Sequence, residues 1–273
     1  MTCGTAAGLK SNVGVTHDRT IFRPATLTQA TELKQRFQEN AVWFAGGSKL
    51  NAVPTKTDHT VAISLSLLPL KSIEWQDGIL RIGAVVTLEA LRESPLIPRA
   101  LYDALGFVYS RHIRNQATIG GEIAACQREH ALLPVLLVLD AQVQLASNDV
   151  IPLESYLAAP DDRLITHLIL QDPFRRCATR TVRETADGWA VVTAAVALTG
   201  NNEQRIAVDG AGCGISRLPQ VEAKNLSGEA LEKAVSQAVN PKADLLGSEE
   251  YKRYITGILV SDLLTDCRQM GEE

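Results

Sequence analysis

The chain has 273 residues, of which 45% are hydrophobic and 21% charged, and its net charge is −4. This length exceeds that of a usual single core, so we expect two or three lobes, and the slightly acidic balance excludes a basic stripe for nucleic acid. The longest apolar stretch, Leu132–Leu139, is too short to cross a bilayer, so we expect a cytoplasmic protein without a membrane anchor.

The first elements are a tail, a helix and a strand. Residues 1–18 are mostly small and polar, lack the features of a secretory signal, and are expected to form a flexible tail. Thr26 followed by Gln29 has the spacing of a capping box, which predicts that a helix begins there. Ala41–Ala45 is a short apolar run that predicts a buried strand, and Gly46-Gly47 ends it abruptly.

The next stretch alternates short strands and helices. Ile73–Trp75 and Leu80–Ile82 flank Asp77-Gly78, which is a strong hairpin signal. Thr87 is placed to cap a short helix. Further elements are expected as helices over 101–109 and 132–139 and as strands over 143–145 and 164–170.

Pro173 marks a boundary before a second kind of pattern. Beyond it the alternation of apolar and polar residues predicts strands, and two longer amphipathic segments then predict helices. The strands are expected over 179–183, 191–198 and 205–208, and the helices over 228–239 and 248–267. We therefore expect a separate C-terminal α+β domain over 173–273.

Two glycine-centred segments, Phe44–Ser48 and Ile113–Gly121, carry most of the functional information. Glycine has no Cβ, so each pair is expected to form a turn that takes up positive φ and exposes backbone N–H groups to an anion. Ser48 adds a hydroxyl that can donate to a phosphate oxygen, and Thr118 stands at a similar corner. Taken singly, each segment also fits an ordinary tight turn of an α/β protein.

Together, and about seventy residues apart, Ala45–Ser48 and Thr118–Gly121 resemble the two flavin-binding turns of the FAD subunit of molybdenum hydroxylases. That family includes the flavin domain of xanthine dehydrogenase and the medium subunit of carbon monoxide dehydrogenase. The likeness covers about residues 20–270 and continues through 122–125, 132–141, 192–197, 222–228 and 247–253. It implies an α+β protein: a two-subdomain FAD-binding fold of the vanillyl-alcohol-oxidase/molybdopterin-dehydrogenase flavin type over 19–172 (subdomains about 19–66 and 67–172), followed by the C-terminal domain.

The resemblance also implies which residues contact the cofactor. The first turn would lie along the pyrophosphate and ribityl chain, through Trp43, Ala45, Gly46, Gly47, Ser48, Lys49 and Leu50. The opposite wall would be formed by Ile113, Thr118, Gly120, Gly121 and Glu122. Val108, between Phe107 and Tyr109, would lie near the isoalloxazine ring unless this stretch is only a packed helix end, and Ile165 and Arg180 would reach the cofactor from later strands.

Several positions depart from the pattern of the family that the chain resembles. Relatives usually carry Asn where Glu122 stands, Ser-Pro where Gln127-Arg128 stands, and an Asp where Ala131 stands, whereas Lys49 occupies an often acidic position. A carboxylate about 4 Å from a phosphate would repel it by ~1 kcal/mol in water-like surroundings and ~4 kcal/mol at an effective dielectric near 20. Lys49 would offset that repulsion if its ammonium reaches the same phosphates. The alternative is that both side chains point into solvent.

The chemistry implied by the resemblance is electron transfer, so no catalytic acid or base is assigned. FAD would pass electrons to an acceptor such as NAD, and the partners would be a molybdopterin-binding subunit and a two-cluster iron–sulfur subunit; a homodimer is possible for the isolated chain. No metal is expected in this chain, because its five cysteines are scattered, at positions 3, 126, 177, 213 and 267, without a C-x-x-C pair.

Two other functions stay open at this stage. One is a structural subunit of the same complex that has lost FAD through the changes at Glu122 and Ala131. The other is a free-standing nucleotide-binding module that uses paired glycine turns. Yellow colour after purification would separate the first from a flavoprotein, and co-purification with metal-bearing chains would separate the second.

Overall fold

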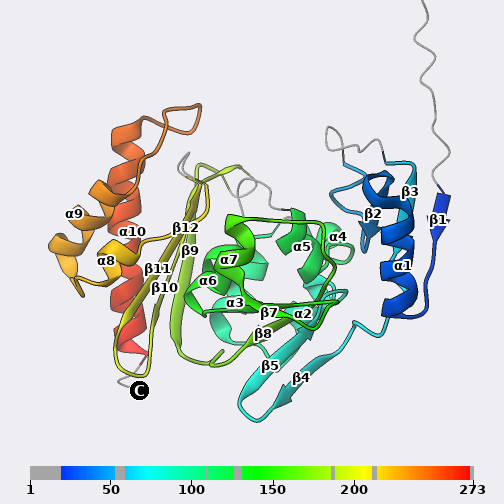
Figure 1. The fold of residues 1–273 in the computed structure, drawn as a ribbon. Helices are drawn as coiled ribbons and strands as arrows, with labels where there is room; N and C mark the ends of the chain where they lie inside the picture. The colour runs from blue at the N-terminus through cyan, green and yellow to red at the C-terminus, as the bar shows by residue number, and fades with distance from the viewer. Residues whose placement is uncertain are drawn as a thin grey trace, which may run out of the picture.

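The structure is a computed structural model that describes residues 20–52, 59–108, 110–125, 131–185, 188–210 and 214–270. The predicted tail over 1–18 lies outside these residues. Three β-sheets follow one another along the chain, and Figure 1 shows each with its own helices. Each sheet also has its own hydrophobic cluster. The predicted mixture of helices and strands is confirmed.

The N-terminal region is a small parallel sheet covered by one helix (blue in Figure 1). Its elements are β1 (Thr20–Phe22), α1 (Leu27–Phe37), the short 3₁₀ helix η1 (Gln38–Asn40), β2 (Ala41–Phe44) and β3 (Val61–Ser64), in the strand order β1-β3-β2. Thr26 caps α1 as predicted, since its Oγ1 accepts the N–H of Gln29 at 3.2 Å. The apolar face of α1 buries Ala30 against the sheet, so local capping and amphipathicity together fix this helix.

The middle region is built on a five-stranded antiparallel sheet of order β4-β5-β8-β6-β7. Its strands are β4 (Ile73–Gln76), β5 (Ile79–Gly83), β6 (Gln142–Leu145), β7 (Val150–Pro152) and β8 (Ile165–Leu170). The predicted hairpin is confirmed: Asp77 and Gly78 both take positive φ, 53° and 81°, as the primed turns that match strand twist require.

Six helices complete the middle region: α2 (Leu88–Glu93), α3 (Arg99–Gly106), α4 (Arg111–Arg114), α5 (Ile119–Ala125), α6 (Leu133–Val138) and α7 (Leu153–Ala158). Thr87 caps α2 through its Oγ1. The helix expected over 101–109 is wrong at its end, because α3 stops at Gly106 and Tyr109 lies outside the described residues. Every residue of α6 is buried, since it packs both in its own region and against the next sheet.

The C-terminal region is a four-stranded antiparallel sheet of order β12-β11-β10-β9 with helices on one face (Figure 1). Its elements are β9 (Arg176–Arg183), β10 (Ala190–Leu198), β11 (Gln204–Gly210), β12 (Ser216–Arg217), α8 (Pro219–Glu222), α9 (Gly228–Ala238) and α10 (Glu249–Gln269). Ala195 and Ala197 of β10 join the core of the middle region, whereas Ala194 and Val196 pack toward α9 and α10. The sheet is therefore covered on both faces, which explains why β10 is a nearly continuous apolar run.

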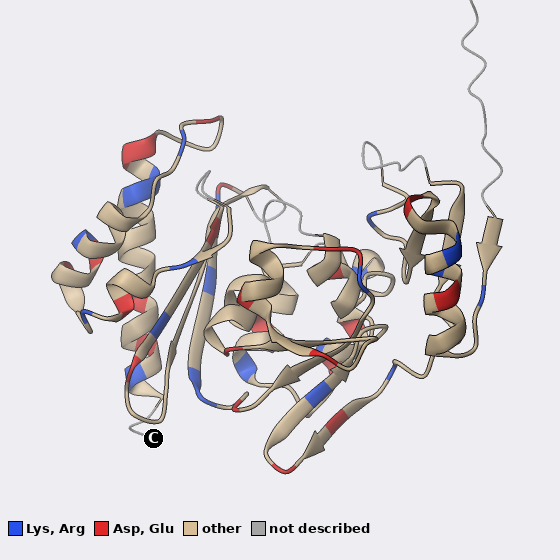
Figure 2. Cartoon of the chain, in the orientation of Figure 1, with Lys and Arg blue, Asp and Glu red and all other residues tan. Residues whose placement is uncertain are grey.

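The charged residues are spread over all three regions. Figure 2 shows Lys and Arg interspersed with Asp and Glu on the described elements. Among the described residues, no helix is both long enough and apolar enough to cross a bilayer.

Candidate functional site

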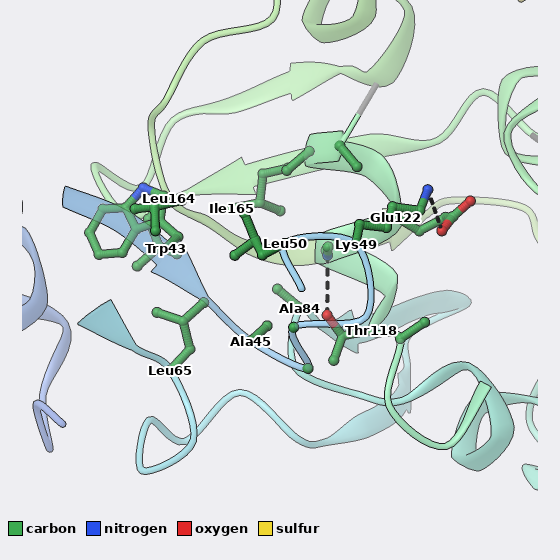
Figure 3. Close-up of a pocket in the computed structure, with 18 of the residues that line it drawn as sticks. Trp43, Ala45, Lys49, Leu50, Leu65, Ala84, Thr118, Glu122, Leu164 and Ile165 are labelled. Atoms are coloured by element: carbon green, nitrogen blue, oxygen red, sulfur yellow. Dashed lines mark hydrogen bonds and ion pairs between the residues drawn. The ribbon is translucent and has the colours of Figure 1, made fainter. Parts of the chain in front are cut away.

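A cavity of about 370 Å³ opens between the N-terminal and middle regions. It is lined by the turn after β2, by α5 with the residues just before it, and by the segment that leads into β8 (Figure 3). Its volume lies within the range of small-molecule sites, roughly 300–1,000 Å³.

The first glycine segment forms a turn at one wall of this cavity. β2 ends at Phe44, and Gly47 takes φ 71°, a left-handed conformation that favours glycine. The carbonyl of Gly47 accepts the N–H of Asn51 at 3.0 Å and closes the turn. No acceptor among the described residues is found for the N–H groups of Gly46, Gly47 and Ser48 or for the Ser48 hydroxyl. These donors are therefore available to a ligand.

The second glycine segment is not a turn of the same kind, and that prediction is wrong. Gly120 and Gly121 lie in the first turn of α5, and neither takes positive φ. Their N–H groups already have acceptors: Gly120 donates to Ala84 O at 2.9 Å, and Gly121 donates to Thr118 Oγ1 at 3.2 Å. Thr118 therefore caps a helix, and the amides of this glycine pair are not free for a phosphate.

Close packing explains one glycine in each pair. A Cβ on Gly46 would lie 1.5 Å from Gln116 O, and a Cβ on Gly120 would lie 2.6 Å from Ala84 Cβ. Both glycines thus let backbone segments from different parts of the chain approach each other. Gln116 lies three residues before Ile119, where α5 begins, so the contact at Gly46 brings the two glycine segments together at the cavity.

Two opposite charges meet across the cavity wall. Lys49 Nζ lies 3.0 Å from Glu122 Oε2, and the side chains are 19% and 4% exposed (Figure 3). The alternative that both side chains point into solvent is wrong for Glu122. Lys49 pairs with this carboxylate in the structure, and the expectation that its ammonium reaches the phosphates of a cofactor stays a prediction.

The third wall is the segment of residues 161–165, which sequence reasoning identified only at Ile165. Trp43 Nε1 donates to Asp162 O at 2.6 Å, and Lys34 Nζ lies 2.9 Å from Asp162 Oδ2. Tyr156 OH donates to Asp161 O at 3.3 Å. These contacts hold the segment between β2 and α7, where tertiary packing rather than a sequence motif places it.

All of the predicted cofactor-binding residues except Val108, Ile113 and Arg180 line the cavity. Val108 is buried in the core of the middle region, and Ile113 packs against the same core. Arg180 belongs to β9, where its guanidinium lies 2.9 Å from Asp266 of α10. Gln127-Arg128 lies outside the described residues.

An ion-pair cluster connects α2 with α4, just before the second glycine pair. Arg114 Nε donates to Glu89 Oε2 at 2.6 Å, and Arg111 Nε lies 3.0 Å from Glu89 Oε1. The hydrogen bond from Arg114 holds the pKa of the Glu89 carboxyl below its ordinary value, although burial acts in the opposite direction. Arg114 also donates to Val108 O at 3.1 Å, so this cluster ties α2 to the chain just before α5. Within the described part of the chain, no group of three His, Cys, Asp or Glu side chains is placed to hold a metal ion.

Comparison with known families matches residues 15–171 to the FAD binding domain in molybdopterin dehydrogenase. The chain belongs to this family. Two relatives match different shares of this chain. The uncharacterized protein YgfM of Escherichia coli (strain K12) is 57% identical over 252 residues, covering 92% of this chain and 97% of YgfM. The nicotinate dehydrogenase FAD-subunit of Eubacterium barkeri is 29% identical over 137 residues, covering 48% and 46%.

Solved structures are similar in fold to nearly the whole chain. Carbon monoxide dehydrogenase from Hydrogenophaga pseudoflava matches with a TM-score of 0.81 at 20% identity, over 92% of this chain and 97% of that one. Quinoline 2-oxidoreductase from Pseudomonas putida 86 matches with a TM-score of 0.78 at 17% identity, over 92% and 97%. The predicted family and its flavin-binding fold are therefore confirmed.

Proposed function

We propose that the cavity between the N-terminal and middle regions is the FAD site of this oxidoreductase-family subunit. The observation that carries the proposal is the turn at Gly46–Ser48, where three consecutive N–H groups have no acceptor among the described residues. Backbone polar groups in folded proteins are nearly always paired, and consecutive N–H groups in a turn form a concave site for an anion. A phosphate of FAD would satisfy these donors.

The remaining walls fit the other parts of such a ligand. Leu50, Leu65, Leu164 and Ile165 give the cavity apolar surface that would exclude water from a flavin. The ion pair of Lys49 with Glu122 neutralises the carboxylate deepest in the wall, so that no isolated negative charge faces the phosphates there. When bound, the flavin supplies the redox chemistry, and the protein supplies position and electrostatics.

We further propose that the chain acts as the electron-transfer subunit of a molybdopterin-dependent dehydrogenase resembling xanthine dehydrogenase. It would work beside an iron–sulfur subunit and a molybdopterin-binding subunit, with an acceptor such as NAD, and the organic substrate would bind on another chain. Family membership supports this role. So does the relative in Eubacterium barkeri that is named as the FAD-subunit of nicotinate dehydrogenase.

Release and identification of the bound flavin tests the FAD proposal. We expect the purified chain to be yellow, or to become yellow on reconstitution, and to release FAD on denaturation. FMN alone would contradict the proposal, and a chain that binds no flavin would favour the structural-subunit alternative. Purification from the native source tests the complex: co-purifying iron–sulfur and molybdopterin chains are expected, whereas a chain recovered alone would favour the free-standing module.

A further inference from the structure

Both cations in the described cavity wall are paired with carboxylates of the same wall. The cations are Lys49 and Arg163, and the carboxylates are Glu122, Asp161 and Asp162. Lys49 pairs with Glu122 at 3.0 Å, and Arg163 pairs with Asp161 at 2.6 Å. Carboxylates therefore outnumber cations in this part of the wall, although the site is proposed to take a ligand with two phosphates.

Lys49 is the cation best placed to meet such a ligand. It follows Ser48 directly, so its stem begins at the turn whose N–H groups are available. Glu122 is 4% exposed and fixed in the first turn of α5, whereas Lys49 keeps 19% of its side chain exposed. The Glu122 carboxylate is thus the more buried partner, and the Lys49 side chain keeps more contact with solvent.

We infer that Glu122 competes with the phosphates of FAD for the Lys49 ammonium and so limits how tightly the cavity holds a charged flavin. This inference rests on the proposed FAD site. A phosphate that approaches the turn gains the attraction of Lys49 only as the ion pair with Glu122 weakens, and it is repelled by the carboxylate at the same time. The ring and ribityl chain of the flavin are uncharged, so this competition acts on the phosphates.

The affinity ratio between FAD and riboflavin isolates this effect. Riboflavin has the same ring and ribityl chain but no phosphate, so general damage to the cavity lowers both affinities and cancels in the ratio. The proteins compared are the flavin-free full chain, Glu122→Gln, Lys49→Met and the double variant. The dissociation constants are measured by quenching of flavin fluorescence at low and high salt.

Glu122→Gln is expected to raise the preference for FAD over riboflavin about tenfold, which is 1.4 kcal/mol. Lys49→Met is expected to lower this preference by a similar factor, and the double variant to return close to the original ratio, because the two side chains act on one another. Both single effects are expected to shrink at high salt. If Lys49→Met does not fold, the comparison of Glu122→Gln with the original chain still tests whether the carboxylate limits FAD binding.

Asp103→Asn provides the control. It also removes a carboxylate that is paired with a cation, Arg99 at 2.9 Å, but neither of these side chains lines the cavity. We expect this variant to keep the original ratio within about twofold. An equal FAD-to-riboflavin ratio in all proteins, or a lower one in Glu122→Gln, overturns the inference while the FAD site stands. Failure of every protein to bind FAD overturns the proposed site together with it.

Discussion

The two glycine pairs of this chain look alike in the sequence, and the structure uses them differently. Gly46-Gly47 forms a turn with one positive φ and amides that have no acceptor among the described residues. Gly120-Gly121 begins α5, and its amides donate to Ala84 and Thr118. The N–H groups of the first pair are therefore available to a ligand, whereas those of the second pair form hydrogen bonds within the protein.

The difference teaches that a glycine pair in a sequence indicates close packing of two chain segments more directly than it indicates a ligand-binding turn. Gly46 and Gly120 each sit where a Cβ would collide with backbone or side-chain atoms of another segment. These contacts bring together the segments that line the cavity. The positive φ at Gly47 and the amides without an acceptor among the described residues distinguish the first segment from the second.

The largest effect is expected for Gly46→Ala. The added Cβ would lie 1.5 Å from Gln116 O, which is a backbone atom that cannot turn aside. The two glycine segments would have to separate, so we expect a loss of stability at or above the ~1–3 kcal/mol that overpacking usually costs. FAD affinity should fall with it. Denaturant unfolding and flavin titration of the same preparation measure the two losses.

Gly200→Ala is the control for this substitution. A Cβ there meets no atom within 4 Å, so the change in stability should stay within about 0.5 kcal/mol. If Gly46→Ala is as stable as this control, the close contact between the two glycine segments is not what assembles the cavity.

Much of this architecture was predictable because its signals are local. The capping residue Thr26, the Asp77-Gly78 hairpin and the first glycine turn each act through their own neighbours. The rest depends on segments distant in the sequence. The segment of residues 161–165 reaches the cavity through contacts with β2 and α7. Arg180 pairs with α10 because that helix covers β9. The domain boundaries at 66/67 and 172/173 stay predictions.

A second, smaller effect is expected in how stability depends on pH, through the ion-pair cluster next to the second glycine segment. The pKa of Glu89 is lowered by its hydrogen bond from Arg114 behind the second glycine segment. Because its pKa is lowered, the ionised Glu89 carboxylate stabilises the fold at pH values above the ordinary pKa of 4.5. This stabilisation is lost as the pH falls below 4.5 and through the lowered pKa. Unfolding measured from pH 7 downward should therefore show Glu89→Gln less stable than the original chain at pH 7, with the gap closing in acid.

Glu93→Gln is the matched control for this pH effect. Glu93 is 60% exposed and contacts only Arg111 of the same cluster among the described residues. Its substitution should change stability little and equally at each pH. A gap for Glu89→Gln that stays constant down to acid pH would show that the ionised form of Glu89 does not stabilise the fold.

The smallest effects are expected at two hydroxyl groups, that of Ser48 after the first glycine pair and that of Thr118 before the second. The Ser48 hydroxyl has no acceptor among the described residues and lines the cavity, so Ser48→Ala should leave stability unchanged and weaken FAD binding by about two- to tenfold, the value of one hydrogen bond. Thr118 Oγ1 instead accepts the N–H of Gly121, so Thr118→Val should cost ~1 kcal/mol of stability as a lost helix cap. Flavin titration and denaturant unfolding of both variants decide the matter. If Thr118→Val weakens FAD binding more than Ser48→Ala does, without loss of stability, then the second segment also binds the cofactor through its side chain.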